Sequence, residues 1–234
     1  MMGVLWSLIH PGFLLGLYTL AFGVILKARW GFSGNTGEYA LVLFLGMVVL
    51  NSLTEVINKS SAVILDNPNL VKRVVFPLEL LSVVTVATAF IHALVGLSVW
   101  MVVFIIFFGF PGINAIYFPL VFVCLAPLLL GFAWLFSAVG VFFKDIRNIA
   151  EMLSHVLLFL SPVFYSIDSA PAIVRSALLV NPITFLIEQL RSTLFSGQRP
   201  SFEGLAIYFL VALLFASVCF LFFRRLQPNF ADMV

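Results

Sequence analysis

Apolar stretches near 20 residues in length recur along the whole of this 234-residue chain. A helix of about 20 apolar residues matches the thickness of the hydrocarbon core of a bilayer. The composition agrees, because 63% of the residues are hydrophobic and 9% are charged, whereas a soluble domain averages roughly 25% charged residues. The sequence therefore predicts an all-α, polytopic membrane protein in which residues 1–234 form a single transmembrane domain.

Six transmembrane helices are expected, and the fourth contains Pro119 and Pro127. These prolines predict a kink, because proline lacks the amide hydrogen that continues a helix. Seven of the 12 lysines and arginines fall on the inner face if the N-terminus lies inside. The inner loops are also the shorter ones, so both termini are expected to be cytoplasmic. The expected spans are residues 11–26, 39–65, 80–108, 116–143, 149–164 and 205–223.

A polar island, residues 66–79, separates the second and third expected spans. Asn67 is a favourable helix N-cap, Pro68 suits the first helical position, and Pro77 ends the run. A short amphipathic helix is therefore expected at about 67–76, and such a helix at a membrane face is a suitable contact for another protein. One side of this helix carries Leu70, Val71, Val74 and Val75, and the other carries Asn69, Lys72 and Arg73.

The segment 161–200 contains two apolar pieces, Ala172–Val180 and Ile183–Leu194, that are too short to span a membrane. Asn181-Pro182 separates them. Short helices interrupted by proline indicate a re-entrant or interfacial hairpin at about 171–195 between spans five and six. A simple outer loop with surface helices is the alternative. Glu188 and Arg191 lie three residues apart, a spacing that favours an ion pair.

The sequence contains none of the common signatures of a catalytic or metal centre. It has no GxxxxGK[ST] loop for ATP, no G-x-S-x-G elbow and no HExxH motif. The net charge of +2 is too small and dispersed for nucleic acid. We therefore expect no catalytic residue, no metal and no cofactor on this chain. Cys124 and Cys219 lie in apolar spans, where cysteine usually serves as a small buried hydrophobe.

A polar stripe follows the inner half of the second span through Asn51, Glu55 and Asn58. An ionisable group inside a span usually faces the bundle interior or water. Glu55 with Lys59, four residues on, also has the spacing of an ordinary ion pair near the surface. The sequence leaves open whether Glu55 lines a transport pathway or only forms a local ion pair with Lys59.

Aromatic residues make up 15% of the chain. Most are expected to face lipid or lie at the interface. A polysaccharide path would favour aromatic faces, because these stack on sugar rings and tolerate sliding. The candidates for such a path, each weighed against a structural role, are Tyr18, Phe22, Phe159, Phe164 and Tyr165.

Motifs spread over nearly the whole chain occur together in one order. They are Leu5-Trp6 followed by Pro11, Tyr18-Thr19 and Phe22, Asn67 through Pro77, Phe143-Lys144-Asp145-Ile146, Ser161-Pro162-Val163-Phe164-Tyr165, Asn181-Pro182, Glu188 and Arg191. With these motifs the chain resembles the permease subunit of bacterial ABC exporters for O-antigen and capsular polysaccharides, the polysaccharide and polyol-phosphate export permeases. Family members usually begin with an amphipathic, basic helix, and Met1 to Trp6 do not match it.

The resemblance implies a homodimer in the bacterial cytoplasmic membrane with two copies of a separate ATPase, which binds the ATP and Mg²⁺. The island would be the coupling helix, with Asn67 to Arg73 as contacts. Lys144 and Asp145 would form a second contact, with Asp145 also capping the fifth helix. The segment after Tyr165 would form outer gating helices, and the substrate would be a lipid-linked glycan.

Other functions remain open from the sequence. A permease of the same class for teichoic acid or drugs is one alternative. An intramembrane enzyme for lipid-linked sugars would use polar groups such as Glu55 or His92. His92 aligns with Thr85, Thr88 and Gly96, a line that more often marks a helix-packing seam than a catalytic row. A passive membrane anchor for an ATPase is a further alternative.

Overall fold

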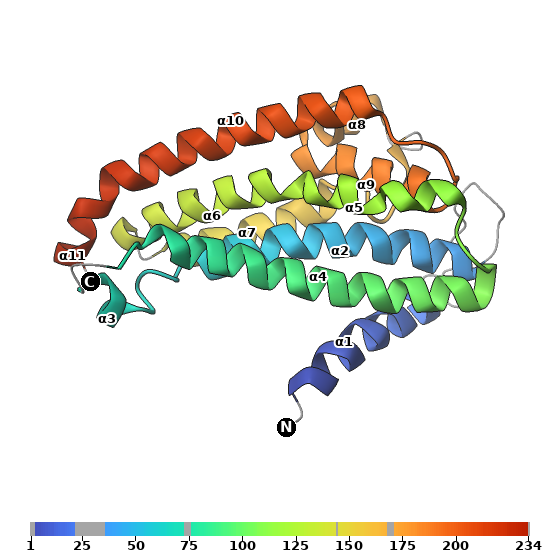
Figure 1. Ribbon diagram of the computed structural model, residues 1–234, viewed down its shortest axis with the longest axis horizontal. Helices are drawn as coiled ribbons and strands as arrows, with labels where there is room; N and C mark the ends of the chain where they lie inside the picture. Colours follow the sequence, from blue (N-terminus) through green and yellow to red (C-terminus); the bar gives the residue numbers. More distant parts are fainter. Residues whose placement is uncertain (1–2, 22–35, 73–75, 144, 168–170, 234) are drawn as a thin grey trace. The chain divides into compact units, whose positions relative to one another are not determined.

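The computed structural model describes residues 3–21, 36–72, 76–143, 145–167 and 171–233. Throughout these ranges the regular structure is helical, with no β-strand (Figure 1). The longer helices are α1 (Gly3–Tyr18), α2 (Thr36–Ser60), α4 (Glu79–Phe108), α6 (Leu125–Phe142), α7 (Ile146–Phe159), α9 (Pro182–Leu194) and α10 (Phe202–Leu226). The shorter ones are α3 (Pro68–Val71), α5 (Phe118–Val123), α8 (Ala172–Val180) and α11 (Phe230–Met233), with 3-10 turns at Ile113–Tyr117 and Gln227–Asn229.

Within the described ranges, four segments are long and apolar enough to cross a membrane: Glu38–Ser60, Glu79–Phe108, Ile113–Phe142 and Phe202–Asn229. Pro11–Ala21 is a shorter apolar helix. Helix α7 has 14 residues, fewer than the roughly 20 that a straight span requires. The all-helical, multi-span class is thus confirmed, and the total of six spans remains a prediction.

Two predicted span ends are wrong. Helix α2 ends at Ser60 rather than at residue 65, and residues 61–66 form turns. Helix α7 ends at Phe159 rather than at residue 164. Pro162 explains the second difference, because proline has no amide hydrogen and disfavours helical backbone in the preceding residue.

The sixth span is longer than predicted. The fourth contains a one-residue interruption, and the kink predicted for it remains a prediction. Helix α10 covers Phe202–Leu226, with Glu203 in its first turn and two arginines in its last, which complements the helix dipole. Between α5 and α6 the helix is interrupted at Cys124. Pro127 lies three residues later and cannot donate to the Val123 carbonyl, which accounts for the interruption.

The residues group into two compact units. The first comprises Met1–Asn51, Ile91–Phe122 and Leu158–Ser201; the second comprises Ser52–Phe90, Val123–Leu157 and Phe202–Val234. Helices α2, α4 and α7 therefore each contribute residues to both units.

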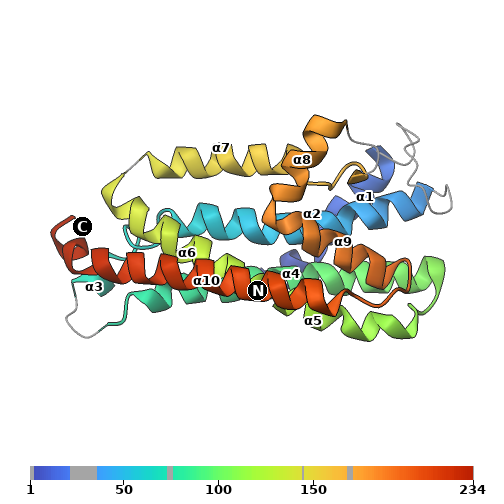
Figure 2. The same cartoon turned by 90° about the horizontal axis from the view of Figure 1, so that it is seen from above.

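The core of the first unit is built on Trp100 of α4, which is fully buried. Its Nε1 donates to the Leu41 carbonyl of α2 at 2.9 Å. Its ring stacks on Phe104, with centroids 4.9 Å apart, and meets the edge of Phe195 at 5.6 Å. Helices α8 and α9, which belong to the same unit, pack against one another (Figure 2).

The second unit is organised around α6 and α10, which run side by side (Figure 1). Gly131 of α6 leaves no room for a Cβ, because the Phe215 ring would lie 2.5 Å away. Ala212, Ala216 and Cys219 are buried on α10. Small residues of this kind let two helices approach closely in a membrane. Trp134 and Phe220 fill the adjacent space with ring centroids 4.7 Å apart.

Candidate functional site

The polar island folds as a short helix, α3, that begins at Pro68 as predicted. The prediction that the Asn67 side chain caps this helix is wrong. The backbone carbonyl of Asn67 accepts from the amides of Leu70 at 3.0 Å and Val71 at 3.3 Å. The Asn67 Nδ2 instead donates to the carbonyl of Val63 at 2.8 Å. Because the backbone carbonyl already satisfies the Leu70 amide, the side chain is available for the preceding turn.

Helix α3 is shorter than the predicted 67–76. It ends at Val71 with Lys72 as its C-cap, and Phe76 and Pro77 are not helical. Arg73 and the two valines after it lie outside the described residues.

The described part of the island is amphipathic. Val71 is buried and Leu70 is partly buried, whereas Asn69 and Lys72 are exposed. Asn69 and Lys72 thus form a polar surface on top of an apolar contact. Such an arrangement suits binding to another protein.

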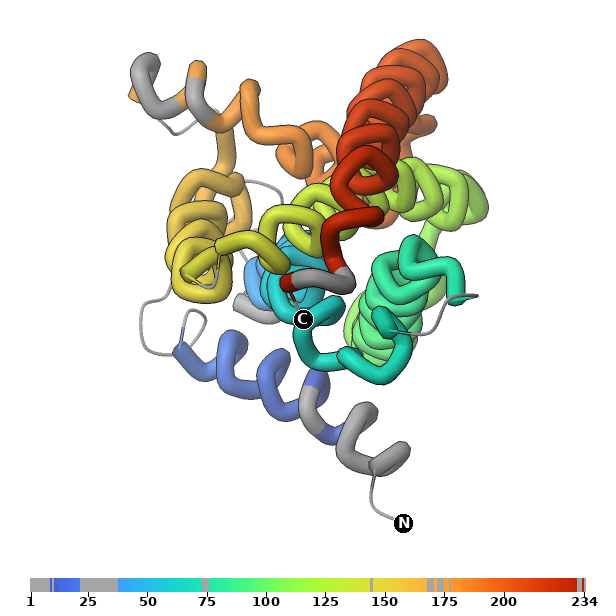
Figure 3. The backbone as a smooth tube through the Cα atoms, turned by 90° about the vertical axis from the view of Figure 1, so that its left-hand side faces the viewer, coloured from blue at the N-terminus to red at the C-terminus, as the bar shows by residue number. Residues whose placement is uncertain are grey.

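An apolar cluster joins α3 to α6, α10 and α11. The backbones of α3 and α11 and the C-terminal ends of α6 and α10 lie at the same end of the second unit (Figures 1 and 3). We call these buried residues the α3 platform: Ile64, Val71, Leu78, Ala138, Val141, Phe223 and Phe230. The rings of Phe223 and Phe230 meet edge to face with centroids 5.3 Å apart. Close-packed interiors transmit displacement rather than absorb it. The α3 platform is therefore a packed connection from α3 to α6 and α10.

The turn that leads into α3 is also held closely against α6. A Cβ on Gly140 would overlap the carbonyl group of Ser61. The neighbour is backbone, so it cannot move aside as a flexible side chain would. Glycine at position 140 is therefore required by this contact.

The second predicted contact, at residues 143–145, is only partly described. Phe143 and Asp145 are exposed, and Lys144 lies outside the described residues. Asp145 directly precedes α7, and its carbonyl accepts from the Ile149 amide at 3.2 Å. The cap by the Asp145 side chain remains a prediction.

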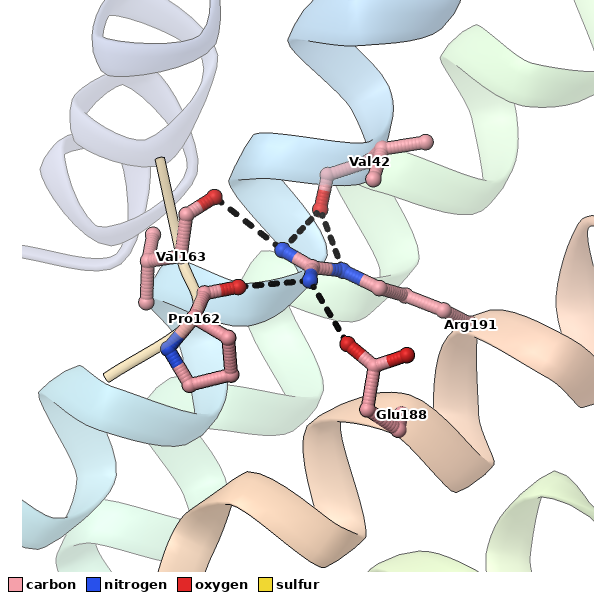
Figure 4. A network of polar contacts seen from close by, with 5 residues as sticks. All are labelled: Val42, Pro162, Val163, Glu188 and Arg191. Carbon is pink, nitrogen blue, oxygen red and sulfur yellow. Dashed lines mark hydrogen bonds and ion pairs between the residues drawn. The ribbon is translucent and has the colours of Figure 1, made fainter. Parts of the chain in front are cut away.

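In the first unit, Arg191 of α9 is the centre of a buried polar network (Figure 4). Its Nη1 donates to the Pro162 carbonyl at 2.6 Å, and its Nη2 donates to the Val163 carbonyl at 3.1 Å. The carbonyl of Val42 in α2 accepts from Nε and Nη2, at 3.3 Å each. The predicted pair with Glu188 is confirmed, with Nη1 at 3.2 Å from Oε1.

The guanidinium has room in this site because α2 carries Gly46 there. A Cβ on Gly46 would lie 2.9 Å from Arg191 Nη2. Arg191 is 4% exposed, and this burial lowers its pKa to about 10, while the charge of Glu188 raises it. The side chain is therefore protonated at neutral pH and supplies charge-assisted hydrogen bonds to three carbonyls.

Asn181 and Tyr39 hold the rest of the turn that follows α7. The Asn181 Nδ2 donates to the Leu160 carbonyl and to Ser161 Oγ, at 2.9 Å each. Its Oδ1 accepts from the Ile183 amide at 3.1 Å and so caps α9. The hydroxyl of Tyr39 donates to the Phe164 carbonyl at 2.7 Å. The two short helices predicted around Asn181-Pro182 are thus present, and α9 is joined to α2 by the hydrogen bonds of Arg191.

The residues of the polar stripe on α2 differ in their local contacts. Glu55 pairs with Lys59 at 2.6 Å, as expected for neighbours four residues apart. The Asn58 Nδ2 donates to Ser154 Oγ of α7 at 3.0 Å. Asn51 is exposed.

Four of the five aromatic residues predicted for a glycan path lie within the described residues. The Tyr165 hydroxyl donates to the Phe159 carbonyl at 2.6 Å, and the Phe159 side chain is 70% exposed. Phe164 and Tyr18 are partly buried, and Phe22 lies outside the described residues. A role for these residues in contacting a glycan remains a prediction.

The described residues contain no group of three or more His, Cys, Asp or Glu side chains placed to hold a metal. Cys124 and Cys219 are buried free thiols, which confirms their interpretation as small hydrophobes.

The residues of the predicted helix-packing seam on α4 differ in their burial. Gly96 packs against Val48, and Thr85 is buried, but His92 is exposed.

Similarity to known proteins covers almost the whole chain. Residues 1–195 match the family model described as ABC-2 type transporter. The O-antigen export system permease proteins RfbA of Myxococcus xanthus and of Klebsiella pneumoniae are each 21% identical, over 100% of this chain and 88% of theirs. The polysialic acid transport protein KpsM of Escherichia coli is 24% identical, over 91% of this chain and 82% of its own. The chain, whose described helices include four of membrane-spanning character, therefore belongs to the ABC-2 type transporter family, as a membrane subunit rather than an enzyme.

Proposed function

We propose that this chain is the permease half of an ATP-driven exporter that moves a lipid-linked polysaccharide, of O-antigen or capsule type, across the bacterial cytoplasmic membrane. The relatives named for O-antigen export and polysialic acid transport support this substrate class. The observation that carries the mechanism is the α3 platform, which joins a short, partly exposed helix to two long apolar ones.

The working transporter is a homodimer of this chain with two copies of an ABC ATPase, which binds ATP and Mg²⁺. Six spans per chain place both termini and α3 on the cytoplasmic side, where the ATPase contacts the exposed Asn69 and Lys72. Arg73, Lys144 and Asp145 extend this contact. The four described spans and the positive-inside count support this topology.

Export follows from the coupling of nucleotide binding to two states of the permease. Closure of the ATPases on ATP displaces α3, and the platform passes this displacement to α6 and α10. A partner drives such a change only if it binds one state better than the other. The contact at Lys72 must therefore be stronger in the ATP-bound state.

The outer side carries the α8–α9 hairpin as a re-entrant element. Its backbone polar groups could not remain unpaired at membrane depth, since each would cost several kcal/mol. The side chains of Arg191, Asn181 and Tyr39 donate to four carbonyls of the turn that precedes the hairpin, those of Leu160, Pro162, Val163 and Phe164. The glycan passes Tyr18, Phe22, Phe159, Phe164 and Tyr165, whose rings stack on sugars.

Co-purification tests the proposal. The full chain is expressed with an ABC ATPase encoded beside it, and the amount of ATPase recovered is measured for wild type, Lys72→Glu and Arg224→Glu. Arg224 is the matched control, because it is exposed at the end of α10, where its guanidinium lies over the Phe220 ring. We expect Lys72→Glu to lose the ATPase and Arg224→Glu to keep it. Equal recovery with all three chains contradicts the assignment of α3.

A further inference from the structure

The second unit contains a cleft of about 360 Å³ where α2, the turn after it, α4 and α7 meet. Cavities that hold small ligands run from about 300 to 1,000 Å³. The cleft therefore has the size of a ligand site, and the coupling mechanism above does not use it. Its lining consists of Asn58, Lys59, Ala62, Val63, Asp66, Asn67, Thr85, Arg147 and Glu151.

The cleft lies at the depth of lipid headgroups. The membrane-spanning segment of α2 ends at Ser60, and that of α4 begins at Glu79. The lining residues come from the last turns of α2, from the polar turn beyond it and from the first turns of α4 and α7. This placement at the border between apolar and polar segments holds for either orientation of the chain.

The charges on the cleft are of both signs. Lys59 is already bonded to Glu55. The ion pairs found within the described ranges do not involve the guanidinium of Arg147 or the carboxylates of Asp66 and Glu151. The cleft thus presents one cation and two anions that are available to a ligand.

Asn58 adds a buried acceptor to these charges. Its Nδ2 bonds to Ser154, but its Oδ1 is buried and receives no hydrogen bond from the described residues. A buried acceptor without a donor is destabilising, and native structures normally supply one. A ligand with an N–H group would complete this site.

A zwitterion with a phosphate and a primary ammonium matches this set of groups. We propose that the cleft binds the phosphoethanolamine headgroup of a membrane lipid. The phosphate pairs with Arg147. The ammonium lies between Asp66 and Glu151 and donates to the Oδ1 of Asn58. An anionic headgroup without an amine would be repelled by the two carboxylates, and a choline headgroup has no N–H to donate.

The bound headgroup would join the start of α7 to the turn that leads into α3. This inference rests on membrane embedding, which the family and the apolar helices show, and not on the proposed substrate or the ATPase contact.

Native mass spectrometry of the full chain in a mild detergent tests the proposal. Phosphatidylethanolamine, phosphatidylcholine and phosphatidylglycerol are each titrated, and the dissociation constant of the first bound lipid is measured. We expect phosphatidylethanolamine to bind about tenfold or more tightly than the other two, because a charge-assisted hydrogen bond contributes on that scale.

Two isosteric or near-isosteric variants locate the site. Glu151→Gln is expected to remove about tenfold of the preference for phosphatidylethanolamine, because it removes a contact of the ammonium. Arg147→Gln is expected to weaken phosphatidylethanolamine binding about tenfold, because it removes the contact of the phosphate, which all three lipids carry. Both residues are exposed, so neither change threatens the fold. Glu203→Gln and Arg224→Gln, exposed charges of the same unit outside the cleft, are the matched controls and should keep the preference.

Each other outcome overturns the proposal. Equal binding of the three lipids would indicate a nonspecific lipid shell, and tighter phosphatidylglycerol would indicate a plain anion site. Unchanged binding in both cleft variants, or an equal loss in the controls, would place the lipid elsewhere. Displacement by a lipid-linked diphosphate that lacks an amine would assign the cleft to the transported substrate instead.

Discussion

The guanidinium of Arg191 donates from both Nε and Nη2 to the carbonyl oxygen of Val42, at 3.3 Å in each case, across 149 residues of sequence. This contact fixes α9 to α2 inside the first unit. Because the same side chain also serves the carbonyls of Pro162 and Val163, one residue holds three segments together.

Replacing Arg191 by alanine should strongly destabilise the first unit. The change leaves buried carbonyls without donors and Glu188 without its partner, at a cost of about 3 kcal/mol or more. Arg191→Lys should restore only part of the lost stability, because one ammonium cannot reproduce the planar set of donors of the guanidinium. The measurement is the thermal unfolding midpoint of the purified protein in detergent.

Arg199→Ala is the control for this series, since Arg199 is exposed in the same unit. Its unfolding midpoint should equal that of the wild type. If Arg191→Ala unfolds at the same temperature as Arg199→Ala, the network does not stabilise the hairpin.

A methyl group at position 46 should weaken the same network from the α2 side. The Cβ of Gly46→Ala would lie 2.9 Å from Arg191 Nη2 and 3.5 Å from the Cα of Val163. Overpacking of this kind costs about 1–3 kcal/mol. Gly16→Ala is the matched control, because nothing lies within 4 Å of its Cβ. Equal unfolding midpoints for both variants would contradict the crowding at Gly46.

Gly140→Ala should damage the turn before α3. The new Cβ would overlap the Ser61 carbonyl group, and the backbone there has little freedom to move. We expect reduced ATPase stimulation by the permease as well as a lower unfolding midpoint. Gly16→Ala again serves as the control, and an unimpaired Gly140→Ala would show that α6 does not hold this turn.

The sequence predicted those features that depend on local chemistry. Pro68 marked the start of α3, and Asn181-Pro182 marked the boundary between α8 and α9. In each case proline or asparagine imposes a backbone conformation that neighbouring residues cannot override. Glu188 and Arg191 were also paired correctly from their spacing.

Contacts between residues far apart in the sequence could not be predicted from local patterns. The spacing to Glu188 revealed one acceptor of Arg191, but Val42, Pro162 and Val163 lie far away in sequence. An arginine within an otherwise apolar segment was the available signal. The cap by Asn67 failed for a related reason, because its side chain had a competing acceptor in Val63.

Cysteine labelling should place α3 and the segment after α9 on opposite sides of the membrane. Asn69→Cys and Gln198→Cys are made in a chain whose buried Cys124 and Cys219 are replaced by serine. Both chosen positions are exposed. An impermeant maleimide should label Gln198→Cys in intact spheroplasts and Asn69→Cys only in inverted vesicles. Labelling of both positions from one side contradicts the proposed topology.

ATP-driven export in proteoliposomes tests whether this chain is the permease of a polysaccharide exporter. The full chain is reconstituted with its ATPase and a lipid-linked glycan, and glycan reaching the opposite leaflet is measured. We expect export that requires both proteins and ATP and that is abolished by Lys72→Glu but not by Arg224→Glu. Export without the ATPase, or export by Lys72→Glu at the wild-type rate, would contradict this function.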